Sequence, residues 1–340
     1  MSINLKKITL CFTLIFAMLS FVGCENINDG KRIVRISHGQ STTHPQHIGL
    51  EAFEQYIEER LPQYDIQIFP NELLGPSVKA IELVQTGAID FVVSSTSNLE
   101  TFNDIYQIFS MPYLFDSVEA YHKVMEDEEI LAPIYDSTEE SGFKAVTWFD
   151  AGTRNFYATT PINTPDDLKG KKIRVIASPT NIKMMEAFGA AATPMSFGEV
   201  YTAIQQGVIQ GAENNELALT NNKHGEIAKY YTYNQHQMVP DMLVGNLKFL
   251  ESLSDEEYKV FEDAAKLCTE VEIEAWQEGI EQAKKEASEE MGVEFIYPDV
   301  NLFKEKVLPL HKEILTENPK LEPIYNNIQN VNKEVKENEK

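Results

Sequence analysis

The order of predicted strands and helices in the first third of the chain restricts the fold most. Short apolar segments typical of strands alternate there with segments whose apolar residues recur at helical spacing. The predicted elements are a strand at 32–37 ("RIVRIS"), a helix at 45–60, a strand at 65–69 ("DIQIF"), a helix at 76–87 and a strand at 88–93 ("AIDFVV"). This order predicts a parallel sheet covered by helices, because parallel neighbours need a crossover connection. Ligands bind such sheets at the carboxyl ends of the strands, where "HGQSTTHP" and "SSTSN" follow.

A second alternation of strands and helices begins near residue 143. The segment "FKAVTWFDAGTRNFYAT" predicts strand, turn and strand, "KKIRVI" predicts another strand, and helices are predicted at 180–189 and 196–207. The segment at 254–292 predicts one long helix or two abutting ones. Two α/β lobes, a chain that crosses between them more than once and a long helix spanning both predict a hinged clam-shell that closes around a small solute.

These patterns give predicted boundaries for the whole chain. The last residues, "NNIQNVNKEVKENEK", have the polar composition of a fraying terminus. The predicted parts are a first α/β lobe at 32–150, completed by a later segment of the chain, a second α/β lobe at 151–250, C-terminal helices at 251–320 packing across both lobes, and a polar tail at 321–340.

The N-terminal segment has the features of an export signal. Lys6 and Lys7 precede a continuous apolar run that ends at Cys24, and this run is too short and wrongly flanked for a stable membrane helix. The sequence "FVGC" resembles a bacterial lipoprotein cleavage box, which implies a signal peptide at 1–23, a lipid on Cys24 and a tether at 24–31. The expected location is the outer face of the cytoplasmic membrane. The alternative is a plain signal peptide with an incidental cysteine. Only Cys268 would then remain in the mature chain besides Cys24, so no internal disulfide is expected.

The net charge of −24 excludes several classes of partner. A field of this sign repels nucleic acid and anionic lipid. It also repels an anionic small molecule at long range. A site for an anion in this chain therefore needs a few well-placed local cations.

Arg174 is a candidate for such a cation. It lies between Ile173 and Val175 in a predicted strand, where neighbouring side chains point to opposite faces. If the two apolar residues enter a core, Arg174 faces either solvent or a cleft. The strand pattern alone leaves both readings open.

Longer motifs favour the cleft. The segments "GTRNFY", "PINTPDDLKGKKIRV", "FGAAATPMSFGEVYTAIQQGVIQGAENN" and "YYTYNQHQMVPD" occur in this order at close spacing. Together they resemble the solute-binding proteins of TRAP (tripartite ATP-independent periplasmic) transporters, the DctP family, over about residues 32–315. "NELLG" and "MPYLF" in the first lobe fit as well. The resemblance implies a periplasmic-binding-protein-like fold of two α/β lobes, a small organic acid held between them, and delivery to a membrane permease driven by an ion gradient, without catalysis.

The resemblance also implies roles for individual residues. Arg174 matches the arginine that grips the ligand carboxylate, and Arg154 matches a second cleft arginine. The other matches are Asn214 beside the same carboxylate, Phe197 packed on the ligand, His236 at the cleft or its water network, and Ser95 and Ser77 facing the variable part of the ligand. Asn214 also fits a turn or cap, and Phe197 also fits an ordinary core.

The residue types suit an ionised sugar acid. A guanidinium matches a carboxylate with two parallel charge-assisted hydrogen bonds and stays charged in a dry cleft. Asn214 adds an amide donor without adding charge. Two further residues are candidates for contact with ligand hydroxyls: His44, where a loop enters a helix, as a donor, and Glu72, near Gly75, as an acceptor.

The motifs look most like those of members that bind hexuronates such as glucuronate and galacturonate. A four-carbon dicarboxylate is an alternative, for which Arg154 is a possible second clamp. Sialic acid is another, although members that bind it tend to have an acidic residue where Ser95 stands. A uronate lyase and a sensory binding protein are further alternatives.

No metal, cofactor or catalytic motif is predicted. His38, His44 and His47 do not have the spacing of a helical His-x-x-x-His pair, and no cysteine or acidic partner is evident beside them. The sequence has no Gly-x-Ser-x-Gly, no Gly-rich phosphate loop and no Cys-x-x-Cys. These absences favour binding over catalysis.

Overall fold

A computed structural model describes residues 30–338 of the chain. The predicted signal peptide, the lipidation site Cys24 and most of the tether lie outside the described residues. Within 30–338, no helix is both long enough and apolar enough to cross a membrane.

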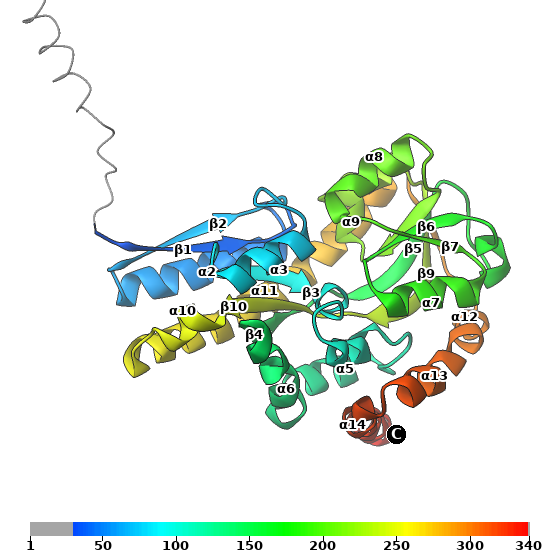
Figure 1. The fold of residues 1–340 in the computed structure, drawn as a ribbon. Helices are drawn as coiled ribbons and strands as arrows, with labels where there is room; N and C mark the ends of the chain where they lie inside the picture. The colour runs from blue at the N-terminus through cyan, green and yellow to red at the C-terminus, as the bar shows by residue number, and fades with distance from the viewer. Residues whose placement is uncertain (1–29, 339–340) are drawn as a thin grey trace, which may run out of the picture.

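The first lobe is built on a five-stranded sheet with the order β2-β1-β3-β10-β4 (Figure 1, blue to cyan with β10 in yellow). β1 is parallel to β2 and β3, as the alternation predicts, whereas β10 is antiparallel to β3 and β4. The strands are β1 (Arg32–Ser37), β2 (Tyr64–Phe69), β3 (Phe91–Ser95), β4 (Phe143–Phe149) and β10 (Asp241–Asn246). The helices of this part are α2 (Pro45–Arg60), α3 (Ser77–Thr86), α4 (Thr96–Leu99), α5 (Val118–Met125), α6 (Glu128–Tyr135) and α10 (Leu247–Glu251).

The second lobe is built on a six-stranded sheet with the order β11-β9-β5-β8-β6-β7. It occupies the green part of the ribbon in Figure 1. Its strands are β5 (Thr153–Ala158), β6 (Lys172–Val175), β7 (Ala191–Pro194), β8 (Gly211–Asn214), β9 (Tyr230–Met238) and β11 (Glu294–Ile296). Its helices are α7 (Pro179–Phe188), α8 (Val200–Gln205) and α9 (Leu217–Thr220).

The predicted boundary of the second lobe at residue 250 is wrong. The chain passes to the second lobe between β4 and β5 and returns between β9 and β10, so residues 241–250 belong to the first sheet and its cover. β10 inserts between β3 and β4 and is the later segment that completes the first lobe. Its apolar alternation alone cannot tell which sheet it joins, because the pairing partners are far away in the sequence.

The long helix α11 (Asp255–Glu289) is a single element of 35 residues. It begins with a capping box in which Ser254 and Glu257 satisfy each other's backbone N–H groups. It packs on α2 and β4 of the first lobe and on α9 of the second. It is therefore the element that spans both lobes, as the sequence predicts.

Gly49 allows α2 and α11 to approach closely. A Cβ at Gly49 would lie 2.7 Å from the backbone oxygen of Cys268, whereas one at Gly279 on α11 would have 3.4 Å to its nearest neighbour. We expect Gly49→Ala to lower the free energy of unfolding by about 1–2 kcal/mol, because overpacking outweighs the gain in helix propensity. Gly279→Ala is the matched control and should raise it by up to about 1 kcal/mol. Urea unfolding of both variants measures the two changes; equal signs would contradict the close-packing argument.

The predicted polar tail is also wrong, because residues 322–338 form helix α14 (Glu322–Asn338). Ile324, Ile328 and Val335 are buried, and α14 packs on α5 and α6 of the first lobe. The apolar residues recur at helical spacing within a polar segment, so composition alone hides them. Two other helices, α12 (Val300–Val307) and α13 (Pro309–Glu317), precede α14, and α12 packs on α7 and β9 of the second lobe. The C-terminal helices thus contact both lobes.

Candidate ligand-binding site

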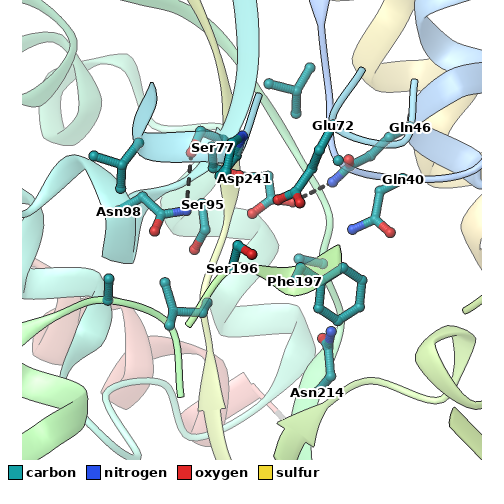
Figure 2. Close-up of a pocket in the computed structure, with 18 of the residues that line it drawn as sticks. Gln40, Gln46, Glu72, Ser77, Ser95, Asn98, Ser196, Phe197, Asn214 and Asp241 are labelled. Carbon is teal, nitrogen blue, oxygen red and sulfur yellow. Dashed lines mark hydrogen bonds between the residues drawn. The ribbon is translucent and has the colours of Figure 1, made fainter. Parts of the chain in front are cut away.

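A cavity of about 260 Å³ lies between the two lobes. Its walls come from the segments that follow β1, β2, β3, β6, β7 and β8. Further residues come from the β4–β5 connection, the starts of β5 and β10, and α11. The cavity thus lies at the carboxyl ends of parallel strands, where the sequence analysis expects a ligand. Figure 2 shows the polar side chains of the first lobe opposite Ser196, Phe197 and Asn214 of the second.

Arg174 is a fixed cation in the wall of this cavity. Its neighbours Ile173 and Val175 are fully buried in the core, and Arg174 itself is only 3% exposed on the opposite face of β6. Its Nε and Nη2 donate to the carbonyl of Met195, at 3.1 and 3.0 Å. Nη1 is buried and has no partner among the described residues. Burial lowers the pKa of Arg174, because it disfavours the charged form of the guanidinium. A bound anion beside Arg174 would stabilise that charged form.

Phe197 lies half-buried beside this guanidinium. The carbon at the centre of the Arg174 guanidinium is 5.4 Å from the centre of the Phe197 ring. The ring also lines the cavity and meets His224 edge-on. Phe197 therefore holds Arg174 from one side and offers an apolar surface to a ligand, instead of belonging wholly to the core.

Arg154 lines the cavity but is already paired. Its Nε and Nη2 donate to the carboxylate of Glu213, at 2.5 and 3.0 Å, and Nη1 donates to Oδ1 of Asn214 at 3.1 Å. Burial is the largest single influence on Glu213, which is 0% exposed, and it disfavours the ionised form. Arg154 and His236 together outweigh burial and lower the pKa of Glu213 to about 2. The positive charge of Arg154 is thus balanced inside the protein.

Asn214 presents its amide nitrogen to the cavity. Its Oδ1 accepts from Arg154 and from the backbone N–H of Asn215, so Nδ2 is left as the group that can donate to a ligand. Asn215 has the turn role instead: its Oδ1 accepts from the backbone N–H of Leu217 at the start of α9. The two adjacent asparagines therefore have different functions.

The predicted first-lobe residues Ser77, Ser95, His44 and Glu72 all line the cavity. His44 caps α2, and its Nδ1 accepts from the backbone N–H of Gln46 at 3.2 Å. Burial lowers the pKa of His44 to about 3. The ring is therefore neutral, and its proton is on Nε2, which can donate to a ligand. Ser95 accepts from Ser97, which leaves the hydroxyl of Ser95 free to donate.

Glu72 connects the two lobes across the cavity. Its Oε2 accepts from the backbone N–H of Gly198 in the second lobe at 3.2 Å. Its Oε1 is buried without a partner among the described residues. Burial raises the pKa of Glu72. The carboxyl group of Glu72 therefore still has capacity to accept hydrogen bonds through Oε1.

His236 lies behind the cavity and does not line it. It is 0% exposed and stacks on Phe156 with 4.7 Å between ring centres. Its Nε2 lies 3.5 Å from Oε2 of Glu213. His236 can therefore affect a ligand only through Glu213 and the arginine that Glu213 holds.

Several cavity residues escaped the sequence reasoning. Trp276 of α11, Gln46 of α2 and Asp241 of β10 line the cavity, and Gln46 donates to Oδ2 of Asp241. Asp241 is the last residue of the motif "YYTYNQHQMVPD", and Gln46 lies two residues after His44, just beyond "HGQSTTHP". Nothing in their local sequence shows that they meet. Glu213 is the acidic residue directly before Asn214, and a buried arginine is the signal that could have singled it out.

The two-lobed fold with one incompletely paired guanidinium in the wall of a cavity between the lobes is that of a protein that binds a small anionic solute. The chain belongs to the DctP family, described as bacterial extracellular solute-binding protein family 7, whose family model matches residues 36–318.

Two relatives of known structure and one further relative support this membership. A TRAP periplasmic solute-binding protein from Anaerococcus prevotii DSM 20548, crystallised with bound α/β-D-glucuronate, is 54% identical with a TM-score of 0.88 over 89% of this chain and 99% of its own. A counterpart from Sulfitobacter sp. NAS-14.1, crystallised with β-D-galacturonate, is 32% identical with a TM-score of 0.84 over 88% of this chain and 100% of its own. Protein YiiZ of Salmonella typhimurium LT2 is 40% identical over 88% of this chain and 92% of its own length.

Proposed function

We propose that this chain captures a hexuronate, glucuronate or galacturonate, outside the cytoplasm and delivers it to an ion-gradient-driven TRAP permease. The observation that carries the proposal is Nη1 of the buried Arg174, which has no partner among the described residues and belongs to a side chain in the wall of the cavity between the lobes. One ligand carboxylate satisfies this nitrogen, with the Asn214 amide as a second donor. The related proteins with bound glucuronate and galacturonate support the choice of ligand class.

The rest of the cavity suits hydroxyl groups better than a second charge. His44 and Ser95 can donate, and Glu72 can accept. A polyhydroxylated ring needs such a mixture. A four-carbon dicarboxylate needs a second free cation, and Arg154 is committed to Glu213. Sialic acid is disfavoured because Ser95 stands where an acidic residue is expected for that ligand.

A binding role without catalysis fits the family, and Cys24 as a lipid anchor would keep the protein at the membrane surface beside its permease. A uronate lyase built on the same cleft would convert the ligand. A sensory protein would bind it identically and present it to a receptor instead of a permease, so co-purification with the permease subunits distinguishes these two partners.

Calorimetry with D-glucuronate and D-galacturonate tests the proposed ligand. We expect micromolar or tighter dissociation constants, about −8 kcal/mol or more favourable. At a ligand concentration of 100 times Kd, binding should stabilise the fold by about 2.7 kcal/mol and raise the melting temperature. Succinate and N-acetylneuraminate are the comparison ligands, and the NMR spectrum of bound uronate should not change over hours. Tighter binding of succinate, or conversion of the uronate, would contradict the proposal.

A further inference from the structure

We propose that Asp241 is the residue that makes the cavity select a polyhydroxylated monocarboxylate over the dicarboxylate of the same carbon skeleton. The inference rests on the proposed function, in which Arg174 holds the one carboxylate of a hexuronate. It adds a residue that the sequence motifs did not identify and a discrimination that Arg174 alone cannot supply.

The position of Asp241 follows from the crossing of the chain between the lobes. It is the first residue of β10, directly after Pro240, and pairs with Ser95 on one side and Phe149 on the other. This register places Asp241 beside a predicted ligand-contacting residue at the edge of the sheet that borders the cavity. Figure 2 shows Asp241 close to Ser95 and Ser77 at the first-lobe side of the cavity.

The Asp241 carboxylate is held in place but keeps acceptor capacity. Gln46, only 2% exposed, donates its Nε2 to Oδ2, and this is the one side-chain donor to the carboxylate among residues 30–338. An ionised carboxylate accepts about four hydrogen bonds. Asp241 is half-buried and faces the cavity, so the remaining lone pairs are available to a ligand.

The charge of Asp241 is not cancelled by a salt bridge. The positive charge of Arg154 acts on Asp241, yet the nitrogens of Arg154 donate to Glu213 and Asn214. Glu72 adds a second carboxyl group to the cavity wall. The cavity wall therefore has two carboxyl groups, whereas Arg174 offers one guanidinium nitrogen without a partner among the described residues.

Two consequences for a ligand follow from this arrangement. A hydroxyl group donates to Asp241, and a hydrogen bond to an ionised acceptor is stronger than one between neutral groups. A second ligand carboxylate has no proton to donate and meets a like charge in a poorly solvated cavity, so either it or Asp241 must take up a proton. Asp241 thus strengthens the binding of a ligand with a hydroxyl group at this position and weakens the binding of a ligand with a carboxylate there. Specificity is the difference between these two affinities.

The substitution Asp241→Asn separates these effects without damaging the fold. Asparagine keeps the shape of the side chain and an acceptor oxygen but removes the charge. Burial raises the pKa of Asp241 to about 6, so at neutral pH the ionised group is less favourable in the folded chain than in the unfolded chain. The variant should therefore unfold at the same temperature as the wild-type protein or higher.

The test compares D-glucuronate with D-glucarate, which has the same six-carbon skeleton as glucuronate but a carboxylate at both ends. Calorimetry at pH 7.5 should show that the wild-type protein prefers glucuronate strongly. In Asp241→Asn, glucuronate should bind about 10–100-fold more weakly, and glucarate should bind at least as well as before. The ratio of the glucuronate affinity to the glucarate affinity should therefore fall by at least about 10-fold. Glu140→Gln, which removes an exposed charge from the first lobe, is the control and should leave both affinities unchanged.

A second variant separates charge from position. Gln46→Met removes the donor that fixes Asp241 but leaves its charge, so we expect weaker glucuronate binding with rejection of glucarate retained. If the wild-type protein binds glucuronate and Asp241→Asn discriminates just as well, the role of Asp241 is disproved while the proposed function stands. If the wild-type protein does not bind a hexuronate at all, the proposed function itself fails.

Discussion

Replacing Arg174 by alanine should weaken the binding of D-glucuronate by about 2–5 kcal/mol. The guanidinium is only 3% exposed, is fixed by two hydrogen bonds to the carbonyl of Met195 and has one nitrogen without a partner among the described residues. Its removal leaves the ligand carboxylate in a closed cavity with Asn214 as its principal remaining donor, and an unpaired buried charge is costly. Isothermal titration calorimetry of the purified variant measures the loss directly.

Arg174→Lys is the matched control for charge. Lysine keeps the positive charge but cannot reproduce the planar fork that donates to both Met195 and a carboxylate. Its affinity should therefore lie between those of the wild-type protein and the alanine variant. An alanine variant that folds normally and binds glucuronate as tightly as the wild-type protein would remove Arg174 from the site and with it the basis of the proposed function.

Replacing Arg154 by methionine should lower the free energy of unfolding by about 3–5 kcal/mol. The reason is the carboxylate of Glu213, which is 0% exposed and would lose its only ion-pair partner among Lys and Arg side chains of residues 30–338, a partner that, with His236, lowers its pKa to about 2. Urea unfolding of the ligand-free protein at neutral pH measures this change. The double variant Arg154→Met/Glu213→Gln should recover much of the stability, because no buried charge then remains uncompensated.

The pH dependence of stability provides an independent check on the same pair. The pKa of Glu213 is lowered from 4.5 to about 2 in the folded protein. Its stabilising contribution is therefore fully present above pH 4.5 and is lost as the pH falls toward 2. The difference in stability between the wild-type protein and Arg154→Met should shrink over this range. A difference that stays constant down to pH 2 would show that Glu213 does not cause it.

The sequence predicts the elements that local patterns define. The alternation of strands and helices at 32–93 predicts the parallel part of the first sheet, and the pattern Ile-Arg-Val predicts which face of β6 is buried. The motifs then predict that Arg174 lies in the cleft. The first two inferences need only a few neighbouring residues, which is why they are confirmed. The position of Arg174 is expected from motifs spread over residues 152–241, and the structure places Arg174 in the cavity wall.

Contacts between distant segments could not be predicted in the same way. Arg154 meets Glu213 because β5 pairs with β8, across a separation of 59 residues. Gln46 meets Asp241 across 195 residues. Whether these residues come into contact depends on the register between paired strands and on which lobe each segment joins. The same limit explains the wrong boundary near residue 250, since β10 joins the first sheet only through its partners.

Helix α14 shows a different limit. Its apolar residues are few, and its polar composition is that of a disordered terminus. What orders it is the surface of α5 and α6, which is invisible in the segment itself.

The position of Trp276 should make its intrinsic fluorescence sensitive to ligand binding. Its indole lines the cavity, meets the His44 ring edge-on at 5.6 Å and packs against Gly152 in the connection between the lobes. The chain has 2 tryptophans, and the other, Trp148, is 6% exposed on β4. A Trp148→Phe variant therefore leaves Trp276 as the single tryptophan, beside the cavity, the connection between the lobes and the long helix. Its emission wavelength should therefore report ligand binding without an attached dye.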